Sequence, residues 1–474
     1  MSETPTTNDR LLEKQRERES NARTYPRYLP IAVERADGVY LEDVEGNTYY
    51  DCLAGAGSIP LGHNHPAVVD AVSDLLDAER PTHTLDVTTP LRDDFLDTLY
   101  ATLPDEFAEH ARVQFCSPAG TDAVEAAVKL MQTATGNRDV LAFRGAYHGM
   151  TAGSLALMGD TEPREQVEVP GHVHHLPYPY DYRPPLGIGG EEEHDALAHQ
   201  VESLLTDPLS GVEDPAAMVV EAVQGEGGTI PAPDDWLREM RRITREHDVP
   251  LVLDEIQAGV GRTGEMYAFE HADIVPDAIL LSKAVGGGLP LSLLVYHERY
   301  DEWASGAHVG TFRGHQLGMA AGRAALTEIV ERDLPAHAAQ MGDRFLAAEQ
   351  GLRPIPVLRV ADVDAPAVDA DGVDRPAAAD QQVDRLVDLV LAAVRGLDEV
   401  AGVEDRRLER VKARHHEVRR RVVRLLDDLR DLAVVVGDAD AVAIGLLVGD
   451  LLDEERGVGA VLALSADDVR EVGV

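Results

Sequence analysis

Short apolar runs alternate with helical patterns from about residue 67 to residue 320. Apolar positions with helical spacing stand out at 120–134 and 235–247. Such alternation predicts an α/β domain around a buried, mostly parallel sheet. Ligands of parallel sheets bind at the carboxyl ends of the strands, so we expect functional residues there. The six runs of strand length occupy residues 113–116, 139–143, 217–223, 249–255, 277–282 and 291–296.

The segments on either side of this region follow other patterns. Residues 1–24 are charged and favour a helical lead-in, and residues 39–51 alternate apolar and polar positions around a Glu-Gly-Asn turn, which predicts a hairpin. We therefore divide the first part of the chain into an N-terminal segment, 1–66, a large domain, 67–320, and a connection into a smaller domain, 321–354.

The character of the sequence changes at about residue 355. Residues 355–474 contain no Phe, Tyr, Trp, Met, Cys, Asn or Thr, although all 22 aromatic residues precede them. Within this tail, 403–432 has the spacing of an amphipathic helix. So restricted an alphabet is typical of a GC-rich gene read out of frame, and a divergent domain is the alternative.

Acidic side chains outnumber basic ones along the whole chain. The 474 residues include 85 Asp and Glu against 43 Lys and Arg, for a formal net charge of −42. This charge opposes binding to nucleic acid and to anionic membranes. Lysine occurs only at positions 14, 129, 283 and 412. Dispersed acidic residues with so little lysine indicate a halophilic protein adapted to high salt, with an ordinary acidic protein as the alternative.

Cysteine and hydropathy patterns point to the cytoplasm. Only Cys52 and Cys116 occur, too few for a disulfide framework or a cysteine-based zinc site, and we expect no metal. The first 20 residues lack the apolar core of a signal peptide, and no run of 18 apolar residues could cross a bilayer. We expect a soluble, cytoplasmic protein.

Lys283 is the sharpest candidate for chemistry. It follows an apolar strand and precedes a glycine-rich turn in LLSKAVGGGLPL. A lysine that forms a Schiff base must be held in place and partly desolvated, so that its neutral amine can attack an aldehyde. A surface lysine at a strand end is the alternative. A chain with almost no lysine has kept this one in an apolar setting, which favours the functional interpretation.

Two further segments carry candidate chemistry. Asp254 and Glu255 end the run VPLVLDE, and a buried carboxylate there needs a cationic partner. The protonated ring nitrogen of a pyridine cofactor would serve, although a magnesium or nucleotide site has a similar pattern. Gly120 and Thr121 in FCSPAGTDAVEAAVKL begin a helix, whose N-terminus suits a phosphate. Helix capping by Thr121 or Asp122 is the alternative.

Together these segments resemble the class III aminotransferases, which have the type I fold of pyridoxal-phosphate (PLP) enzymes. The blocks LAGAGSIPLGHNHP, FRGAYHGMTAGSLALMG, VQGEGGTIPAPDDW, DEIQAGVGRTG, SKAVGGGLPL and GTFRGHQ occur in the family's order. The resemblance covers about residues 22–330. The segments LAGAG, THTLD and SPAGTDAVEAA are most similar to the diaminobutyrate–2-oxoglutarate aminotransferase subgroup.

The resemblance implies a role for each matching residue. Lys283 would hold PLP covalently and move the proton between substrate and cofactor. Asp254 would pair with the pyridine nitrogen and keep it protonated. Gln257 matches the residue near the ring hydroxyl, and Tyr147 matches the aromatic residue stacked on the ring. Without the motifs, a turn residue and a core aromatic are the ordinary interpretations of the last two.

The remaining matches concern the phosphate and the substrate. Gly120 and Thr121 would bind the phosphate, and Thr311 matches a threonine that reaches the phosphate of a neighbouring subunit, which implies at least a homodimer. Glu226 matches an acid on the substrate side. In the family this acid pairs with an arginine of a small C-terminal α/β domain, and nothing after Gly351 resembles that domain.

The resemblance therefore implies a transaminase of the diaminobutyrate–2-oxoglutarate type. It would move the terminal amino group of L-2,4-diaminobutyrate to 2-oxoglutarate, giving aspartate 4-semialdehyde and glutamate. One alternative is the same chemistry on ornithine, 4-aminobutyrate or acetylornithine. A second is an inactive PLP-fold protein, because the substrate-binding C-terminal domain is replaced.

Overall fold

The computed structural model describes residues 6–350 with the exception of residue 166. The chain divides into two units, residues 1–346 and 347–474, and the first is described below. The predicted tail helix at 403–432 lies outside the described residues. So does the place where the family has its substrate-binding arginine.

The N-terminal segment forms helices and a small three-stranded sheet. Its elements are α1 (Thr7–Arg18), α2 (Tyr25–Tyr28), β1 (Val33–Asp37), β2 (Tyr40–Asp43), β3 (Thr48–Tyr50) and α3 (Ala54–Gly57). The predicted hairpin is β2–β3. Asp43 stabilises its turn, because the carboxylate accepts hydrogen bonds from the backbone N–H groups of Glu45 and Asn47, both at 2.9 Å. Strand β1 extends this sheet and was not predicted.

A seven-stranded sheet forms the centre of the large domain, in the order β4-β12-β11-β10-β7-β5-β6. Six strands are parallel, and β12 runs antiparallel to both of its neighbours. The mostly parallel α/β sheet that the sequence predicted is thereby confirmed. The strands are β4 (Ala111–Phe115), β5 (Asp139–Phe143), β6 (Val173–Leu176), β7 (Pro215–Val220), β10 (Leu251–Asp254), β11 (Ala278–Leu281) and β12 (Leu293–His297).

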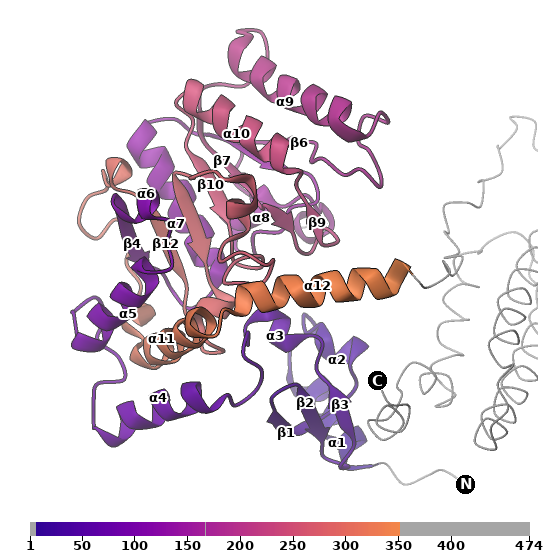
Figure 1. The fold of residues 1–474 in the computed structure, drawn as a ribbon, viewed down its shortest axis with the longest axis vertical. Helices are drawn as coiled ribbons and strands as arrows, with labels where there is room; N and C mark the ends of the chain where they lie inside the picture. Colours follow the sequence, from indigo (N-terminus) through magenta and orange to yellow (C-terminus); the bar gives the residue numbers. More distant parts are fainter. Residues whose placement is uncertain (1–5, 166, 351–474) are drawn as a thin grey trace, which may run out of the picture. The chain divides into compact units, whose positions relative to one another are not determined.

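Helices cover both faces of this sheet (Figure 1). Alternate residues of each strand point to opposite faces, so that Leu251 and Leu253 belong to one apolar cluster while Val252 belongs to the other. One face packs against α7 (Gly120–Thr135) and α8 (Ala152–Leu157). The other face packs against α5 (Pro90–Tyr100), α9 (Gly190–Thr206), α10 (Asp234–Glu246) and α11 (Gln316–Glu331).

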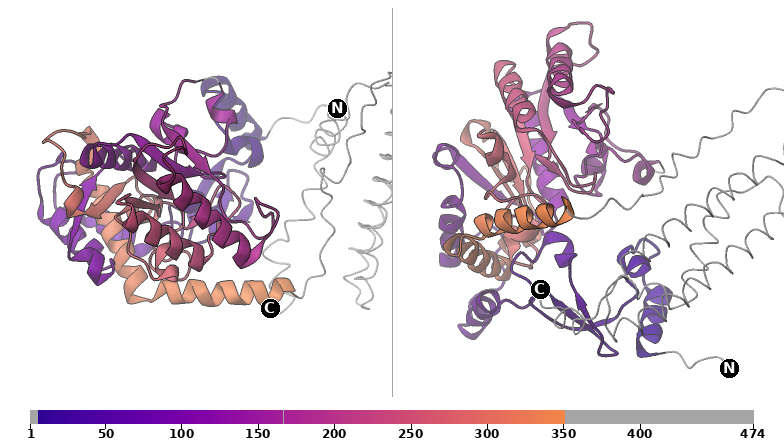
Figure 2. Two further views of the ribbon diagram at one scale, coloured as in Figure 1. Left: turned by 90° about the horizontal axis from the view of Figure 1, so that it is seen from above. Right: turned by 45° about the vertical axis from the view of Figure 1, so that its right-hand side comes forward.

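The described part of the connection that we predicted at 321–354 contains the rest of α11 and α12 (Leu334–Gln350). Helix α11 packs on α4 (Pro66–Asp77) and on α5 (Figures 1 and 2). The remaining regular elements are short: α6 (Asp105–Ala108), β8 (Val223–Gln224) and β9 (Ile230–Pro231). Among residues 6–350, no helix has the length and apolarity needed to cross a membrane.

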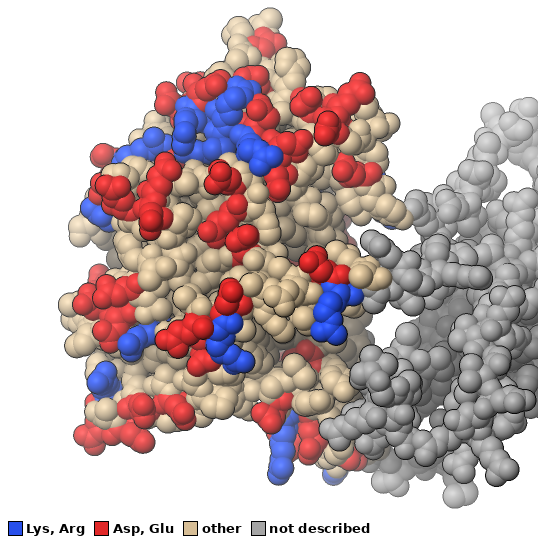
Figure 3. Space-filling model, in the orientation of Figure 1, with Lys and Arg blue, Asp and Glu red and all other residues tan. Residues whose placement is uncertain are grey.

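Acidic side chains are dispersed over the visible surface. Figure 3 shows red patches over most of this face of the molecule, with the basic side chains gathered mainly in one band in the region of α10. Helix α10 carries four arginines, and Arg242 forms ion pairs with Glu202, Glu239 and Glu246. The basic band is therefore partly neutralised by its acidic neighbours.

Candidate active site

The carboxyl ends of the central strands surround a cavity of about 300 Å³. The loops after β5, β7, β10 and β11 line it, together with the first turn of α7. This is the edge of a parallel sheet at which ligands bind. Seven of the eight predicted site residues line the cavity: Gly120, Thr121, Tyr147, Glu226, Asp254, Gln257 and Lys283.

Lys283 opens a short 3₁₀ helix, Lys283–Gly286, two residues after β11 ends. Its φ of 49° lies in the left-handed region, an unusual conformation for a non-glycine residue that is typical of functional sites. The amine donates a hydrogen bond to the side-chain oxygen of Gln257. Burial lowers the pKa of Lys283, more than the nearby Asp254 and Glu226 raise it. A larger share of neutral amine favours its use as a nucleophile.

Asp254 is the last residue of β10 and is only 4% exposed. Its cationic partner in the protein is His148, whose Nδ1 lies 2.7 Å from the carboxylate and whose side chain is fully buried. Burial alone would lower the pKa of His148, but the hydrogen bond and charge of Asp254 outweigh burial and raise it. The sequence prediction missed His148, although it follows Tyr147 directly in the AYHG block.

Successive side chains at the end of a strand point in opposite directions, so Glu255 points away from Asp254. Its two carboxylate oxygens accept hydrogen bonds from the backbone N–H groups of Ala268 (2.9 Å) and Phe269 (3.1 Å). Burial raises the pKa of Glu255 to about 7. Of the two adjacent carboxylates that the sequence singled out, Asp254 lines the cavity and Glu255 stabilises a neighbouring turn.

The first turn of α7 provides an open anion site. Its N-cap is Ala119, and no side chain caps the helix, so capping by Thr121 or Asp122 is not observed. A Cβ at Gly120 would lie 3.0 Å from Ile256 and 3.3 Å from Ser282, which explains the glycine at this position. The uncapped N–H groups therefore face the cavity and suit a phosphate.

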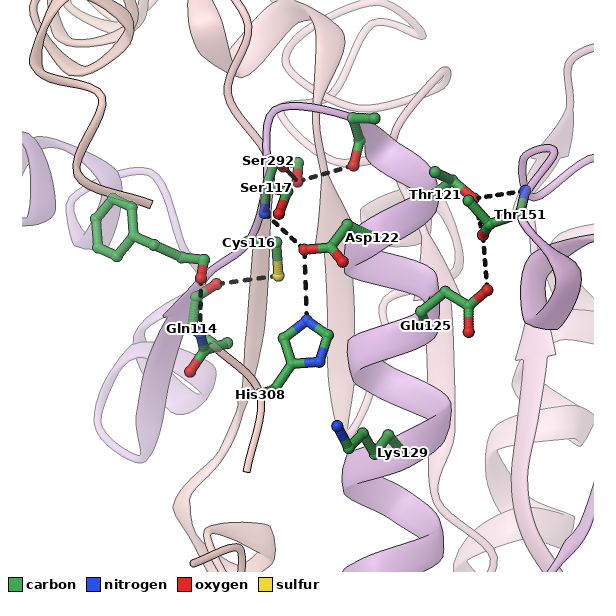
Figure 4. Close-up of polar contacts among 12 residues, drawn as sticks. Gln114, Cys116, Ser117, Thr121, Asp122, Glu125, Lys129, Thr151, Ser292 and His308 are labelled. Carbon is green, nitrogen blue, oxygen red and sulfur yellow. Dashed lines mark hydrogen bonds and ion pairs between the residues drawn. The ribbon is translucent and has the colours of Figure 1, made fainter. Parts of the chain in front are cut away.

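Side chains of α7 attach neighbouring loops to this anion site (Figure 4). Thr121 Oγ1 lies 2.7 Å from Thr151 Oγ1, which in turn donates to Glu125 at 2.6 Å. Asp122 accepts a hydrogen bond from the Ser117 backbone N–H at 2.6 Å and lies 3.4 Å from His308 Nε2. The loop before α7 and the segment around residue 308 are thereby held against the helix.

The same region contains three potential metal ligands. The side chains of Cys116, Asp122 and His308 lie within 4.8 Å of one another, the one such group among residues 6–350. Burial raises the pKa of the Cys116 thiol, and the Arg313 guanidinium is close enough to interact with both Cys116 and Asp122. Burial would raise the pKa of Asp122, yet hydrogen bonds from His308 and Ser117 lower it to about 2. Asp122 and His308 contact each other directly in this group, beside the buried thiol.

Thr311 is the predicted site residue that does not line the cavity. It begins a 3₁₀ turn, Thr311–Gly314, and its side chain is exposed. The Thr311 carbonyl contacts the ring of His83, in the THTLD segment. Several exposed apolar side chains belong to these two segments: Leu85, Val87, Val309 and Phe312.

The residues that line the cavity fit PLP, the cofactor that the resemblance implies. The uncapped start of α7 suits a phosphate, Lys283 offers an amine of lowered pKa for an aldehyde, and Asp254 offers a buried carboxylate for a protonated ring nitrogen. Tyr147 and Gln257 line the same cavity. The roles of the individual residues remain predictions.

Comparisons with known proteins agree with this site. The family model described as aminotransferase class III matches residues 21–357. A diaminobutyrate–2-oxoglutarate aminotransferase of Rhizobium meliloti is 54% identical over 339 residues, 71% of this chain and 72% of that protein. One of Haemophilus influenzae is 47% identical over 339 residues, 71% of this chain and 74% of that protein.

Solved structures of transaminases have the same fold. A PLP-bound amine transaminase of an uncultivated Pseudomonas species is 28% identical, with a TM-score of 0.63 over 70% of this chain and 77% of that one. An ω-transaminase of Thermomicrobium roseum is 25% identical, with a TM-score of 0.65 over 73% and 80%. The cofactor of this protein is pyridoxal phosphate. The chain belongs to the class III aminotransferases.

Proposed function

We propose that this protein transfers the terminal amino group of L-2,4-diaminobutyrate to 2-oxoglutarate, giving aspartate 4-semialdehyde and glutamate. The observation that carries the proposal is 54% identity to a diaminobutyrate–2-oxoglutarate aminotransferase over 339 residues, in a chain whose class III match spans every residue of the cavity. Three further relatives of 37–41% identity carry the same name for their activity.

The residues of the cavity provide what amino transfer requires. Bound PLP supplies an aldehyde for the donor amine and a ring that withdraws electrons. Lys283 acts as the base and acid that moves a proton, and its lowered pKa suits that task. Asp254 holds positive charge at the ring nitrogen, and the buried ring of His148 keeps the carboxylate oriented. Glu226 lies on the wall where a charged donor would enter.

A donor screen tests the proposal. The purified protein is loaded with PLP and supplied with 2-oxoglutarate and one of four amines: diaminobutyrate, ornithine, 4-aminobutyrate or acetylornithine. Glutamate formation is then measured for each. We expect the highest kcat/KM with diaminobutyrate. A higher value with another amine would transfer the assignment to that substrate, and no turnover with PLP bound would favour an inactive PLP-fold protein.

We further propose a homodimer that works in the cytoplasm at high salt. Thr311 lies outside its own cavity and is exposed beside apolar side chains, which supports a role for it in the cavity of a second copy. The dispersed acidic surface supports adaptation to salt (Figure 3).

The tail is the part of the chain that could reduce activity. The family model ends at residue 357, which supports the proposal that residues 355–474 differ from the family's small domain. We therefore expect the exact chain to be a weaker enzyme than a variant whose tail is replaced by that domain from a relative. Equal activity of the two proteins would contradict this expectation.

A further inference from the structure

Glu221 is a buried carboxylate of the cavity that the proposed chemistry does not use. It follows the last residue of β7, between β5 and β10 in the sheet, and is 4% exposed. One oxygen accepts a hydrogen bond from the Tyr147 backbone N–H at 2.9 Å, and the other accepts one from the Gly225 backbone N–H at 3.0 Å.

The two hydrogen bonds join two different loops. Tyr147 belongs to the loop after β5, whereas Gly225 and Glu226 belong to the turn between β8 and β9. These loops also approach each other directly, because a Cβ at Gly227 would lie 2.6 Å from the Gly145 carbonyl oxygen. The carboxylate therefore sets the separation of two loops that both line the cavity.

Each oxygen of Glu221 is used as an acceptor, one for each loop. Burial raises the pKa of Glu221 above its usual value, and the charge of His148, itself hydrogen-bonded to Asp254, limits that rise. A glutamine at this position would keep one acceptor and turn an N–H group toward a backbone N–H, which breaks one of the two contacts.

We propose that Glu221 is a positioning residue that holds Tyr147 and Glu226 in register across the cofactor cavity. Glu221 does not contact the reacting atoms of the substrate or the cofactor. It acts by holding the backbone of the two loops. The proposal rests on the proposed function, because the register of Tyr147 and Glu226 matters only in a cavity that holds PLP and an amine.

Glu221→Gln tests the proposal, with Glu255→Gln as the matched control. Glu255 is also buried, and each of its oxygens also accepts one backbone N–H, but the N–H groups belong to a turn outside the cavity. Each variant loses one backbone N–H contact of a buried carboxylate, so Glu255→Gln controls for the loss of such a contact away from the cavity. A difference between them therefore reports on position in the cavity.

Hydrogen–deuterium exchange of the cofactor-free protein is the first measurement. We expect Glu221→Gln to accelerate exchange in peptides covering 145–149 and 223–228 by roughly 5- to 10-fold, the effect of one lost hydrogen bond. Glu255→Gln should leave these peptides unchanged. The proposal is overturned if the two variants give the same exchange in both peptides. This readout needs neither PLP nor turnover, so it stands apart from the proposed function.

The second measurement is the visible circular dichroism of bound PLP, which depends on the orientation of the ring. We expect Glu221→Gln to change this signal and to lower kcat about 10-fold, while Glu255→Gln keeps the wild-type signal. An unchanged signal in Glu221→Gln would refute the proposal. If Glu221→Gln does not fold, Glu221→Asp takes its place, since the shorter side chain reaches only one loop. The proposal would also be refuted if the backbone N–H groups of Tyr147 and Gly225 showed no protection from hydrogen–deuterium exchange in the wild-type protein.

Discussion

Individual side chains of the cavity act in pairs that cross between strands. Asp254 with His148, and Lys283 with Gln257, each join residues that are far apart in the chain. In each pair one member compensates for the cost of burying the other. Substitution of Asp254 therefore changes the pKa of His148, and substitution of Gln257 removes the acceptor of the Lys283 amine.

Lys283→Ala should remove covalent attachment of PLP and lower turnover by at least about 10²- to 10⁴-fold, the contribution of a positioned acid–base group. Lys129→Ala is the control, because Lys129 is exposed and contacts only a backbone carbonyl, of Ala307. Borohydride reduction followed by mass spectrometry locates the attached cofactor. Attachment or near-normal turnover in Lys283→Ala would exclude this lysine from the chemistry.

Asp254→Asn should leave PLP bound and lower kcat roughly 10²-fold, since a buried charge at the ring nitrogen is lost. It should also lower the pKa of His148, because the carboxylate raises that pKa in the wild type. Asp139→Asn is a matched control. Asp139 is equally buried and bonded to His172 and His174, at the opposite end of the sheet. Near-normal kinetics of Asp254→Asn would remove the carboxylate from the mechanism.

Glu255 should make the protein less stable as the pH rises. Its pKa in the folded protein, about 7, exceeds the usual value of 4.5, so the folded state binds more protons between these values. Stability is lost as the pH rises through this window, by up to about 3 kcal/mol. Urea unfolding at pH 5 and pH 8 measures the loss. In Glu255→Gln the difference between the two pH values should shrink, and an undiminished difference would contradict the assignment.

At the scale of elements, apolar runs predicted the strands well because five of the seven strands of the large sheet are buried on both faces. The observed β5 coincides with the predicted run 139–143, and α7 begins at the predicted residue 120. Strand β1 was missed, because four of its five residues are exposed and its sequence, VERAD, has no apolar run. Exposed edge strands depend on pairing with a neighbour, which hydropathy does not show.

The candidate site was predictable where the chemistry follows directly after a strand, as in Asp254 and Lys283. The partners His148 and Glu221 were not, because the contacts that define them span 106 and 74 residues. Only the fold brings β5, β7 and β10 together. His148 nevertheless lies within the AYHG motif, and Glu221 lies just before the QGEGG motif.

The junction of α7 with the loop after β5 should tolerate no side chain at Gly149. A Cβ there would lie 2.5 Å from Thr121, and its φ of 116° already disfavours other residues. Gly149→Ala should therefore displace Thr121 and weaken PLP binding at least about 10-fold, with a stability cost of roughly 1–3 kcal/mol. Gly136→Ala has comparable strain, at φ 76°, but meets no atom within 4 Å. Fluorescence titration with PLP compares them, and equal affinities would contradict this reasoning.

At the scale of the whole molecule, a highly charged chain has exposed apolar side chains beside Thr311, among them Val309 and Phe312. The net charge of −42 repels a second copy at low salt, whereas the apolar side chains near Thr311 attract it. We therefore expect two copies of the chain to associate more strongly as the salt concentration rises.

Thr311→Ala should weaken PLP retention without altering the cavity of its own subunit. We expect a several-fold faster loss of PLP on dilution, with the dimer intact by analytical ultracentrifugation in molar salt. Thr98→Ala is the control, because Thr98 is a half-buried threonine on α5 whose hydroxyl donates to the Asp94 carbonyl of its own helix. A monomer that retains PLP normally would refute both the dimer and the role of Thr311.

The antiparallel strand β12 has a consequence for how the chain folds during synthesis. It lies between β11 and β4, so β4, which ends at residue 115, has its sheet partner only from residue 293 onward. Until the ribosome has released that residue, β4 exposes an unpaired edge, while β7, β10 and β11 can already assemble. The first strand of the large sheet in chain order is thus the last to be paired. Chaperones would bind the nascent chain at this stage.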